Sequence, residues 1–379
     1  MHFNDSNANL SSLRMARFAR LLFVVAAALP PLTSWSETPQ RIKGVYDRAE
    51  ADVFAKRYGR ASARLQWLLL HDTASAKRTF AYQTALHRIK RKQPLSFGAS
   101  ASLMPSSNIS KTFDGTEKLH SANGDARSGV GLRFGGFAQA IESYAPGREI
   151  IARLGLGRSV YDDTRLNSQT LDFSLAHKWL NAGTTYELAG FANRTRFQPV
   201  DDIETSDVDR SGVRFSVQRV LTNGHSVSGM ASIEASHYIN SDYLDGQRST
   251  IRGMYSIPLS PTETLNFTGG IERADVMKAS YSYGSAILGT RYTRTMPNGL
   301  TWNMGATHTR RNYDALFPVE TPVLRADKVT DISIGLSHRA FKVGETIPRL
   351  TCTSRSHGSN IYLYNYSSID CSIKLQFDF

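Results

Sequence analysis

The chain has 379 residues, of which 41% are hydrophobic and 21% are charged, and its formal net charge at pH 7 is +12. It contains 16 tyrosines and 18 phenylalanines, which excludes a disordered protein, because disordered chains have few aromatic side chains to bury. Beyond the N-terminus no stretch reaches the roughly 18 to 20 apolar residues of a membrane helix, so helical membrane proteins are excluded, whereas β-barrels are not. The positive charge fits a nucleic-acid-binding protein, a protein that binds membrane surfaces, or a barrel with charges inside.

Residues 1–36 are predicted to be a secretory signal peptide. Three arginines precede an uncharged run over residues 21–29, and two prolines separate this run from the small residues before the expected cleavage site. A basic region, a short apolar core and a small-residue exit in this order are typical of a signal peptide, and the core is too short to span a bilayer. Export would bring the mature chain into an oxidising compartment.

Residues 37–93 are predicted to form about three short helices in the periplasm. Apolar side chains recur there with helical spacing and define three faces. Their members are Ala49, Val53 and Phe54; Leu65, Leu68 and Leu69; and Phe80, Leu86 and Ile89. The cations at residues 88 and 90–92 suit the C-terminal end of the last helix, and Pro94 ends it. We expect this segment to be a small accessory domain or a plug.

From residue 94 onward apolar side chains recur at every second position. Leu171 and Phe173, for example, alternate with Asp172. This period predicts strands with one apolar and one polar face. The predicted strands begin near residues 94, 129, 149, 168, 184, 209, 226, 247, 263, 281, 300, 326, 347 and 368. The apolar faces would contact a protein core in a soluble sandwich and lipid in a membrane barrel.

The lengths of the connections favour the membrane barrel. Every second connection is short and rich in hairpin-turn residues, at residues 146–147, 181–183, 223–224, 260–261, 297–299 and 342–344. The intervening connections, such as residues 105–128, are generally longer and more polar. A barrel with one end in the periplasm and the other outside the cell has this alternation, whereas a Greek-key sandwich would scatter its long connections. The predicted fold is therefore all-β, a transmembrane antiparallel up-and-down β-barrel of about 14 strands over residues 94–379.

The last predicted strand supports this fold. Phe377 and Phe379 lie on its apolar face, whereas Lys374 lies on its polar face. An amphipathic terminal strand that ends in phenylalanine resembles the recognition signal of bacterial outer-membrane barrels, which implies the barrel-assembly machinery as a partner. We therefore expect the protein in the outer membrane of a Gram-negative bacterium, surrounded by outer-membrane lipid.

If the apolar faces contact lipid, the polar faces line the lumen with charges of both signs and a modest basic excess. The candidate lumen-facing charges are Arg133, Arg153, Asp172, Lys178, Arg214, Glu234, Arg252, Glu272, Asp331, Arg339, Arg349 and Lys374. Two interpretations stay open: a water-filled lumen without chemistry, and a conduit for a polar or acidic polypeptide. A barrel of this size lies between small filled barrels and porins, so a plugged or partly open lumen is expected.

The sequence contains no recognisable catalytic or metal-binding motif. Its histidines at positions 177, 225, 237, 308 and 338 are scattered, and no HExxH, G-x-S-x-G or phosphate-loop motif occurs. Lysines and arginines recur at strand period instead of clustering with aromatic residues, which argues against a nucleic-acid partner. We expect a non-enzymatic protein without catalytic residues, metal or cofactor. The alternative is a catalytic site assembled at the barrel rim from separated strands.

The two cysteines, Cys352 and Cys371, share the parity of outward-facing apolar residues. A hairpin centred between residues 361 and 362 would place them directly opposite each other. We expect a cross-strand disulfide near the extracellular end of the last hairpin, and two free thiols are the alternative.

Short motifs at both ends of the predicted barrel resemble one known family. Residues 94–97 read PLSF, residues 105–109 read PSSNI, residues 344–350 read GETIPRL and residues 359–366 read SNIYLYNY. In this order and spacing they resemble motifs of the barrel domain of the surface lipoprotein assembly modifier (Slam) family. The resemblance covers about residues 60–379 and is strongest at these two ends.

The resemblance implies a fourteen-stranded outer-membrane barrel with a periplasmic helical domain of the tetratricopeptide type. It also implies a role in moving lipoproteins or related secreted proteins to the cell surface. This chain departs from the family in its helical part, because a tetratricopeptide repeat takes about 34 residues and at least three repeats usually form a stable stack. Only about 48 residues, from 45 to 92, have the helical pattern here. They resemble the terminal helices of the family's domain without the preceding array.

Three functions are compatible with these features, and we favour the first. It is assistance to the translocation or display of a lipoprotein or secreted-protein client at the cell surface. The second is a passive porin-like channel for small solutes, which Arg133, Arg153, Arg214 and Arg252 would bias toward anions. The third is a structural or adhesive barrel that exposes the loop over residues 105–128.

Overall fold

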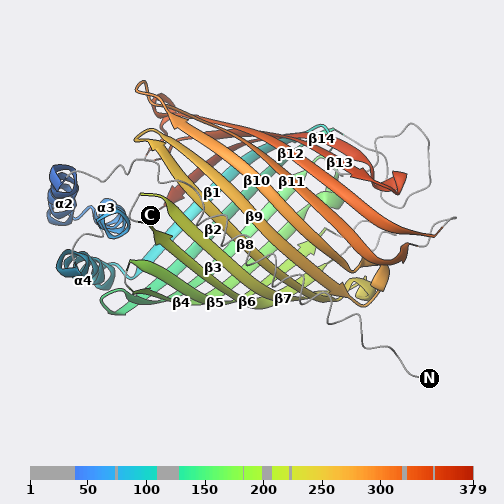
Figure 1. The fold of residues 1–379 in the computed structure, drawn as a ribbon, viewed down its shortest axis with the longest axis horizontal. Helices are drawn as coiled ribbons and strands as arrows, with labels where there is room; N and C mark the ends of the chain where they lie inside the picture. Colours follow the sequence, from blue (N-terminus) through green and yellow to red (C-terminus); the bar gives the residue numbers. More distant parts are fainter. Residues whose placement is uncertain are drawn as a thin grey trace.

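The computed structural model describes residues 39–72, 76–108, 128–181, 183–198, 207–221, 224–317, 322–344 and 346–378. Within these residues, fourteen antiparallel strands form a closed barrel in which each strand pairs with its neighbours in the sequence and β14 pairs with β1 (Figure 1). The predicted up-and-down barrel is therefore confirmed. The predicted signal peptide, Phe379 and most of the loop over residues 105–128 lie outside the described residues.

Three helices precede the barrel: α2 (Pro39–Phe54), α3 (Tyr58–His71) and α4 (Ala76–Lys92). The strands are β1 (Leu95–Ser106), β2 (Gly129–Ala145), β3 (Arg148–Tyr161), β4 (Ser168–Asn181), β5 (Thr184–Phe197), β6 (Val208–Val220), β7 (Ser226–Tyr238), β8 (Gly246–Ser260), β9 (Glu263–Val276), β10 (Tyr283–Thr295), β11 (Leu300–Phe317), β12 (Val323–His338), β13 (Arg349–Ser359) and β14 (Tyr366–Asp378). Short 3₁₀ helices lie in the connections: η1 (Thr164–Leu166), η2 (Asp242–Leu244), η3 (Ala279–Tyr281), η4 (Arg339–Phe341) and η5 (Tyr362–Tyr364). The largest error in the predicted strand starts is at β12, which begins at Val323 and not near residue 326.

The connections alternate in length around the barrel and give it two different ends. At one end, here called the turn end, β1 begins, β14 ends, and tight turns join pairs such as β2 and β3. Gly147 and Gly299 have φ angles of 74° and 89° in two of these turns, and glycine adopts positive φ without the steric cost that a side chain adds. At the other end, the loop end, the connections contain η1, η2, η3 and η5.

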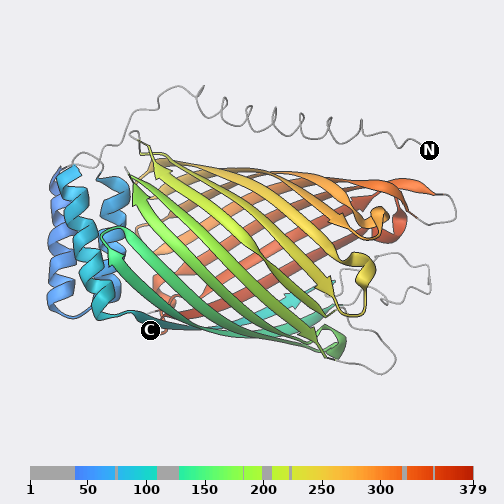
Figure 2. The same ribbon diagram turned by 90° about the horizontal axis from the view of Figure 1, so that it is seen from below.

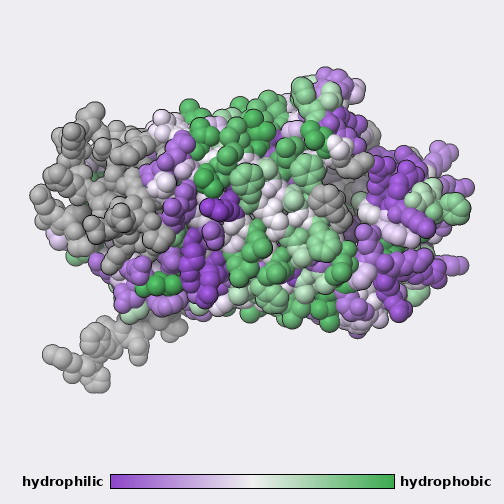
Figure 3. Space-filling model, turned by 180° about the vertical axis from the view of Figure 1, so that it is seen from behind, coloured by the Kyte–Doolittle hydropathy of each residue, from purple (hydrophilic) through white to green (hydrophobic). Residues whose placement is uncertain are grey.

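Apolar side chains cover the outside of the barrel. Leu156, Leu288 and Ile334 are 62%, 62% and 50% exposed. Figure 3 shows hydrophobic residues gathered across the middle of one side, with hydrophilic residues toward both ends. Strand pairing in a closed barrel satisfies the backbone hydrogen bonds, so such an apolar band suits a lipid bilayer. The alternate side chains of each strand therefore face the lumen.

Aromatic side chains border the apolar band at the turn end. The ring of His177 lies between those of Tyr144 and Trp179, at centroid distances of 6.0 and 5.1 Å. Trp179 stacks in turn on Tyr186 of β5. Amphipathic rings concentrate where lipid headgroups meet the apolar core of a bilayer. This cluster therefore marks one edge of the membrane-facing surface.

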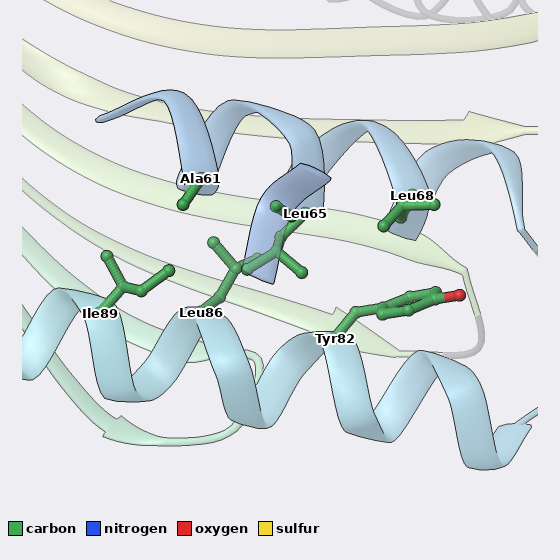
Figure 4. Packing of buried hydrophobic residues seen from close by; sticks show 7 residues of the cluster. Ala61, Leu65, Leu68, Tyr82, Leu86 and Ile89 are labelled. Carbon is green, nitrogen blue, oxygen red and sulfur yellow. The ribbon is translucent and has the colours of Figure 1, made fainter. Parts of the chain in front are cut away.

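The three helices pack against one another at the turn end of the barrel (Figure 2). Apolar residues from α3 face those from α4 in the core of this bundle, as Figure 4 shows. The buried core consists of Ala49 of α2, Ala61, Leu65 and Leu68 of α3, and Tyr82, Leu86 and Ile89 of α4. Asp72 at the end of α3 accepts hydrogen bonds from Arg78 and Tyr82 of α4. No helix in the described part of the chain is long and apolar enough to cross a membrane.

Two phenylalanines assigned to the apolar helical faces are exposed, so that part of the prediction is wrong. Phe54 and Phe80 are 93% and 61% exposed. Phe80 lies two positions before Tyr82, about 200° around α4, and so points away from α3. Phe54 is the last residue of α2 and follows the part of that helix that packs on α3.

The two cysteines lie opposite each other on β13 and β14. Cys352 and Cys371 are register partners with their sulfur atoms 2.12 Å apart. They face outward, like Ile334, the register partner of Cys352 on β12. The sequence led us to expect the pair near the loop end of this hairpin. Because β13 continues past Cys352 to Ser359, the pair lies instead within the barrel wall.

We expect mass mapping of the unreduced protein to find a peptide pair that joins Cys352 to Cys371. Cys352 and Cys371 are 19 positions apart in the sequence. Replacement of both cysteines by serine should lower the free energy of unfolding by roughly 2 to 4 kcal/mol, the usual contribution of a disulfide that closes a loop of this length. Urea unfolding in detergent, with the reduced wild-type protein as the control, would measure it. Recovery of both thiols in alkylated form without reductant would contradict the disulfide.

Candidate functional site

The register places most of the predicted lumen charges on the face opposite the outward apolar residues. These residues are Arg133, Arg153, Asp172, Lys178, Arg214, Glu234, Arg252, Glu272, Asp331, Arg349 and Lys374. Their alternation with apolar neighbours follows from the two-residue period of a strand. The lumen is therefore the place where charged side chains from nearly the whole barrel converge.

Arg339 differs from this prediction. β12 ends at His338, and Arg339 begins η4 in the connection to β13. Its backbone N–H donates to the carbonyl of Gly299 at 3.2 Å, and the ring of His338 accepts a hydrogen bond from the N–H of Ala340. These bonds turn the chain away from the barrel wall, so Arg339 lies at the turn end and not on a lumen-facing strand.

Lumen charges on one part of the wall are paired. Three ion pairs link neighbouring strands between β5 and β9: Arg214 with Glu187, Arg248 with Glu234 and Arg252 with Glu272, at nitrogen to oxygen distances of 3.7, 3.6 and 3.6 Å. Between β12 and β13, Arg355 donates two hydrogen bonds to the Asp331 carboxylate, at 2.7 and 2.8 Å. Two-point pairing of this kind is stronger and more directional than a single contact. The positive charges of Arg214, Arg248, Arg252 and Arg355 are therefore neutralised by carboxylates of the barrel wall itself.

A cavity of about 650 Å³ lies inside the barrel against β1 to β6 and β14. Its charged lining includes Arg133, Arg153, Asp172 and Lys374. The guanidinium of Arg153 lies over the ring of Phe137, 3.9 Å from its centroid. Asp172 accepts a hydrogen bond from the amide of Asn193. This part of the lumen is open space bordered by more positive than negative groups.

Helix α4 is attached to the barrel at the turn end by a buried ion pair. Lys90 of α4 donates to the carboxylate of Glu149 near the start of β3, and both side chains are buried. His87 lies one helical turn earlier, with Nδ1 2.9 Å from the hydroxyl oxygen of Ser143. Burial lowers the pKa of Lys90, and the negative charge of Glu149 opposes that shift. We call this contact the α4 latch.

Sequence reasoning assigned Lys90 a different role. Its position in the last turn of α4 predicted a cation that stabilises the helix dipole. Two features of the sequence pointed to a buried role for Lys90. It directly follows Ile89 on the buried side of α4, and Glu149 lies at a lumen-facing position of β3. Because the two residues are 59 positions apart, only the folded chain brings them together.

A second buried charge pair lies inside the loop end. Arg325 donates two hydrogen bonds to the Asp327 carboxylate, at 3.0 and 2.8 Å, and both side chains are buried. The guanidinium also lies over the ring of Tyr364 in η5, 3.2 Å from its centroid, and His357 Nε2 lies 3.3 Å from Asp327. The sequence prediction missed this cluster, because β12 was expected to begin after Arg325. Arg325 and Asp327 lie two positions apart and on the same face of β12 as Asp331, so the sequence pattern could have placed both of them in the lumen.

No group of three or more histidine, cysteine, aspartate or glutamate side chains is arranged to hold a metal ion in the described ranges of the chain. Several histidines instead hydrogen-bond to a neighbouring polar side chain. Examples are His225 with Tyr255 and His237 with Asp245.

The barrel is also recognised by comparison with known proteins. The model of the surface lipoprotein assembly modifier family matches residues 96–379, which cover the barrel from the second residue of β1. The chain belongs to this family. Its family and fold are those of a non-enzymatic outer-membrane barrel, and this Slam-like barrel lies in the outer membrane with lipid around its apolar band.

Solved structures that align with this Slam-like chain have low sequence identity. The loop L8 deletion mutant of OmpT, an outer membrane protein of Vibrio cholerae, is 8% identical with a TM-score of 0.42, over 75% of this chain and 99% of that chain. The TodX deltaS2S3 mutant monoaromatic hydrocarbon channel is 9% identical with a TM-score of 0.44, over 76% and 91%. CdiB from Acinetobacter baumannii is 12% identical with a TM-score of 0.40, over 75% and 60%. Comparison with curated proteins gives no match.

Removal of one partner of the α4 latch should release the helix. In Glu149→Gln, Lys90 would stay buried beside a neutral amide, and breaking a buried pair in this way costs about 3 to 5 kcal/mol. We expect faster hydrogen exchange over residues 83–92, measured by mass spectrometry in detergent. The double variant Lys90→Met with Glu149→Gln should regain protection, because no charge is left unpaired. Lys92→Gln, an exposed cation on the same helix, is the control, and unchanged exchange in Glu149→Gln would refute the latch.

Proposed function

We propose that this Slam-like barrel assists the passage of lipoproteins or related secreted proteins across the outer membrane to the cell surface. The observation that carries the proposal is the family match over residues 96–379, which covers all but the first residue of the barrel strands. In this arrangement the turn end and the three helices face the periplasm, and the loop end faces outward. β14 with Phe377 would be recognised by the barrel-assembly machinery during insertion.

The position of the helices supports a role in delivery. They lie at the turn end, where a client from the periplasm would first meet the protein (Figures 1 and 2). α4 ends at Lys92 and β1 begins at Leu95, so the helical bundle is joined to the barrel by a two-residue link. We infer that a client binds near α4 and that release of the α4 latch gives access to the lumen.

A passive porin-like channel is the second candidate, and the lumen cavity with its basic lining favours it. The two functions differ in what they require of the ends of the barrel. A permanently open pore needs an unobstructed path. Here a buried ion pair ties α4 to the turn end, and a cation–π contact between Arg325 and Tyr364 ties η5 to the cluster inside the loop end. These contacts favour a lumen that opens only when a client is engaged.

Deletion of this protein should remove its lipoprotein client from the cell surface without changing the client's total amount. Protease treatment of intact cells, compared with lysed cells, separates surface-exposed from total lipoprotein. Wild-type protein supplied in trans should restore surface exposure, and it serves as the control. If every lipoprotein kept its surface exposure in the deletion strain, and the purified protein showed steady single-channel conductance, the porin-like function would replace the proposal.

A further inference from the structure

Three basic side chains form a row where the barrel closes. Lys374 of β14 has Arg349 of β13 as its register partner on one side and Ser102 of β1 on the other. Ser102 is in turn the register partner of Arg133 of β2. All four positions face the lumen, because their neighbours in each strand face outward. Adjacent strands lie about 4.8 Å apart, so Arg349 and Lys374 are one strand spacing apart and Arg133 lies about two spacings beyond Lys374. We call Arg133, Lys374 and Arg349 the basic row.

The basic row lacks the neutralisation found elsewhere in the lumen. In the part of the chain that the structure describes, none of its three members forms an ion pair with a carboxylate. Arg355 lies on the same strand as Arg349 and is paired with Asp331. Like charges directly opposite each other on neighbouring strands repel and destabilise the pairing. An anion bound between Lys374 and its neighbours would remove that cost.

The space for such an anion is present. The lumen cavity of about 650 Å³ is lined by Arg133 and Lys374, and Arg153 lines it from the next strand, β3. The ring of Phe137 lies under the guanidinium of Arg153 and holds it in place. Asp172 is the acidic member of the lining, and its carboxylate already accepts a hydrogen bond from Asn193. Basic groups therefore converge on one cavity from β2, β3 and β14.

We propose that the basic row, with Arg153, binds the carboxylates of an acidic polypeptide segment inside the lumen. The choice of a polypeptide rests on the proposed function, because a client that crosses the barrel would pass this wall. Guanidinium and ammonium groups form their strongest hydrogen bonds with ionised oxygens. Successive side chains on one side of an extended segment lie about 7 Å apart, so two carboxylates can contact cations that are one or two strands apart. The row would then hold such a segment beside the seam between β14 and β1.

The test measures binding of a fluorescent octaglutamate peptide to the purified full-length protein by fluorescence anisotropy. The triple variant Arg133→Gln, Arg349→Gln and Lys374→Gln should raise the dissociation constant roughly tenfold or more, because three charge-assisted contacts are lost. A control variant removes the same charge from the outer face of the barrel, by replacing Arg158, Arg310 and Lys328 with glutamine. These three residues lie on the same face of their strands as the outward apolar residues. That control should bind the peptide as the wild type does.

A second variant guards against a folding defect. Lys374→Glu replaces the like-charge contact with Arg349 by an ion pair across the strands, so its heat-unfolding midpoint in detergent should equal or exceed that of the wild type. Its octaglutamate binding should nevertheless be lost. A lower midpoint together with retained peptide binding would overturn both the repulsion between Lys374 and Arg349 and the binding of carboxylates by the basic row.

Three results would overturn the proposal. One is unchanged peptide binding in the triple variant, and another is an equal loss in the control variant, which would indicate attraction to overall charge. The last is displacement of the peptide by inorganic phosphate at an equal concentration of charge, which would assign the site to small oxyanions instead of a polypeptide. The experiment uses neither cells nor a client, so its failure and failure of surface display in the deletion strain are separate outcomes.

Discussion

The pairing of β1 with β14 is the constraint on which the rest of this structure depends. Inside a bilayer no water is present to satisfy backbone N–H and C=O groups, so a sheet must close on itself. Closure brings residues of the first and the last strand, such as Ala101 and Leu375, into register. Once the sheet is closed, the outward face must be apolar where it contacts the bilayer core, which leaves the lumen and the two ends of the barrel for charged side chains.

That distribution explains why charge pairing differs from one part of the wall to another. Arg252 and Arg355 lie on strands whose neighbours supply carboxylates within ion-pair distance. Near the closing strands the neighbours of Lys374 are a serine on one side and an arginine on the other. A wall that evolved only for stability would pair these charges as well. Excess positive charge at one place, beside open space, therefore points to a passing or bound ligand and not to folding.

The barrel could be predicted from the sequence because its two-residue period is local, and a strand of alternating residues such as Leu171 and Asp172 fixes which side chains face lipid. Turn residues then fixed the alternation of the two ends, and the parity of Cys352 and Cys371 placed them opposite each other. Contacts between distant segments could not be predicted in this way. The ion pair of Lys90 depends on where α4 lies relative to β3, which no local pattern specifies. Arg325 was missed because the predicted start of β12 was three residues too late and left Arg325 in a loop.

The short link between α4 and β1 makes the helix and the closing strand a single mechanical unit. Only Gln93 and Pro94 separate them, the N–H of Gln93 still bonds to the carbonyl of Ile89, and the carbonyl of Pro94 already accepts a hydrogen bond from Ile141 of β2. No slack remains to absorb a displacement. A displacement that separated Lys90 from Glu149 would therefore pull on the first residues of β1. The strain would reach the pairing of β1 with β14, which joins the beginning of the sheet to its end.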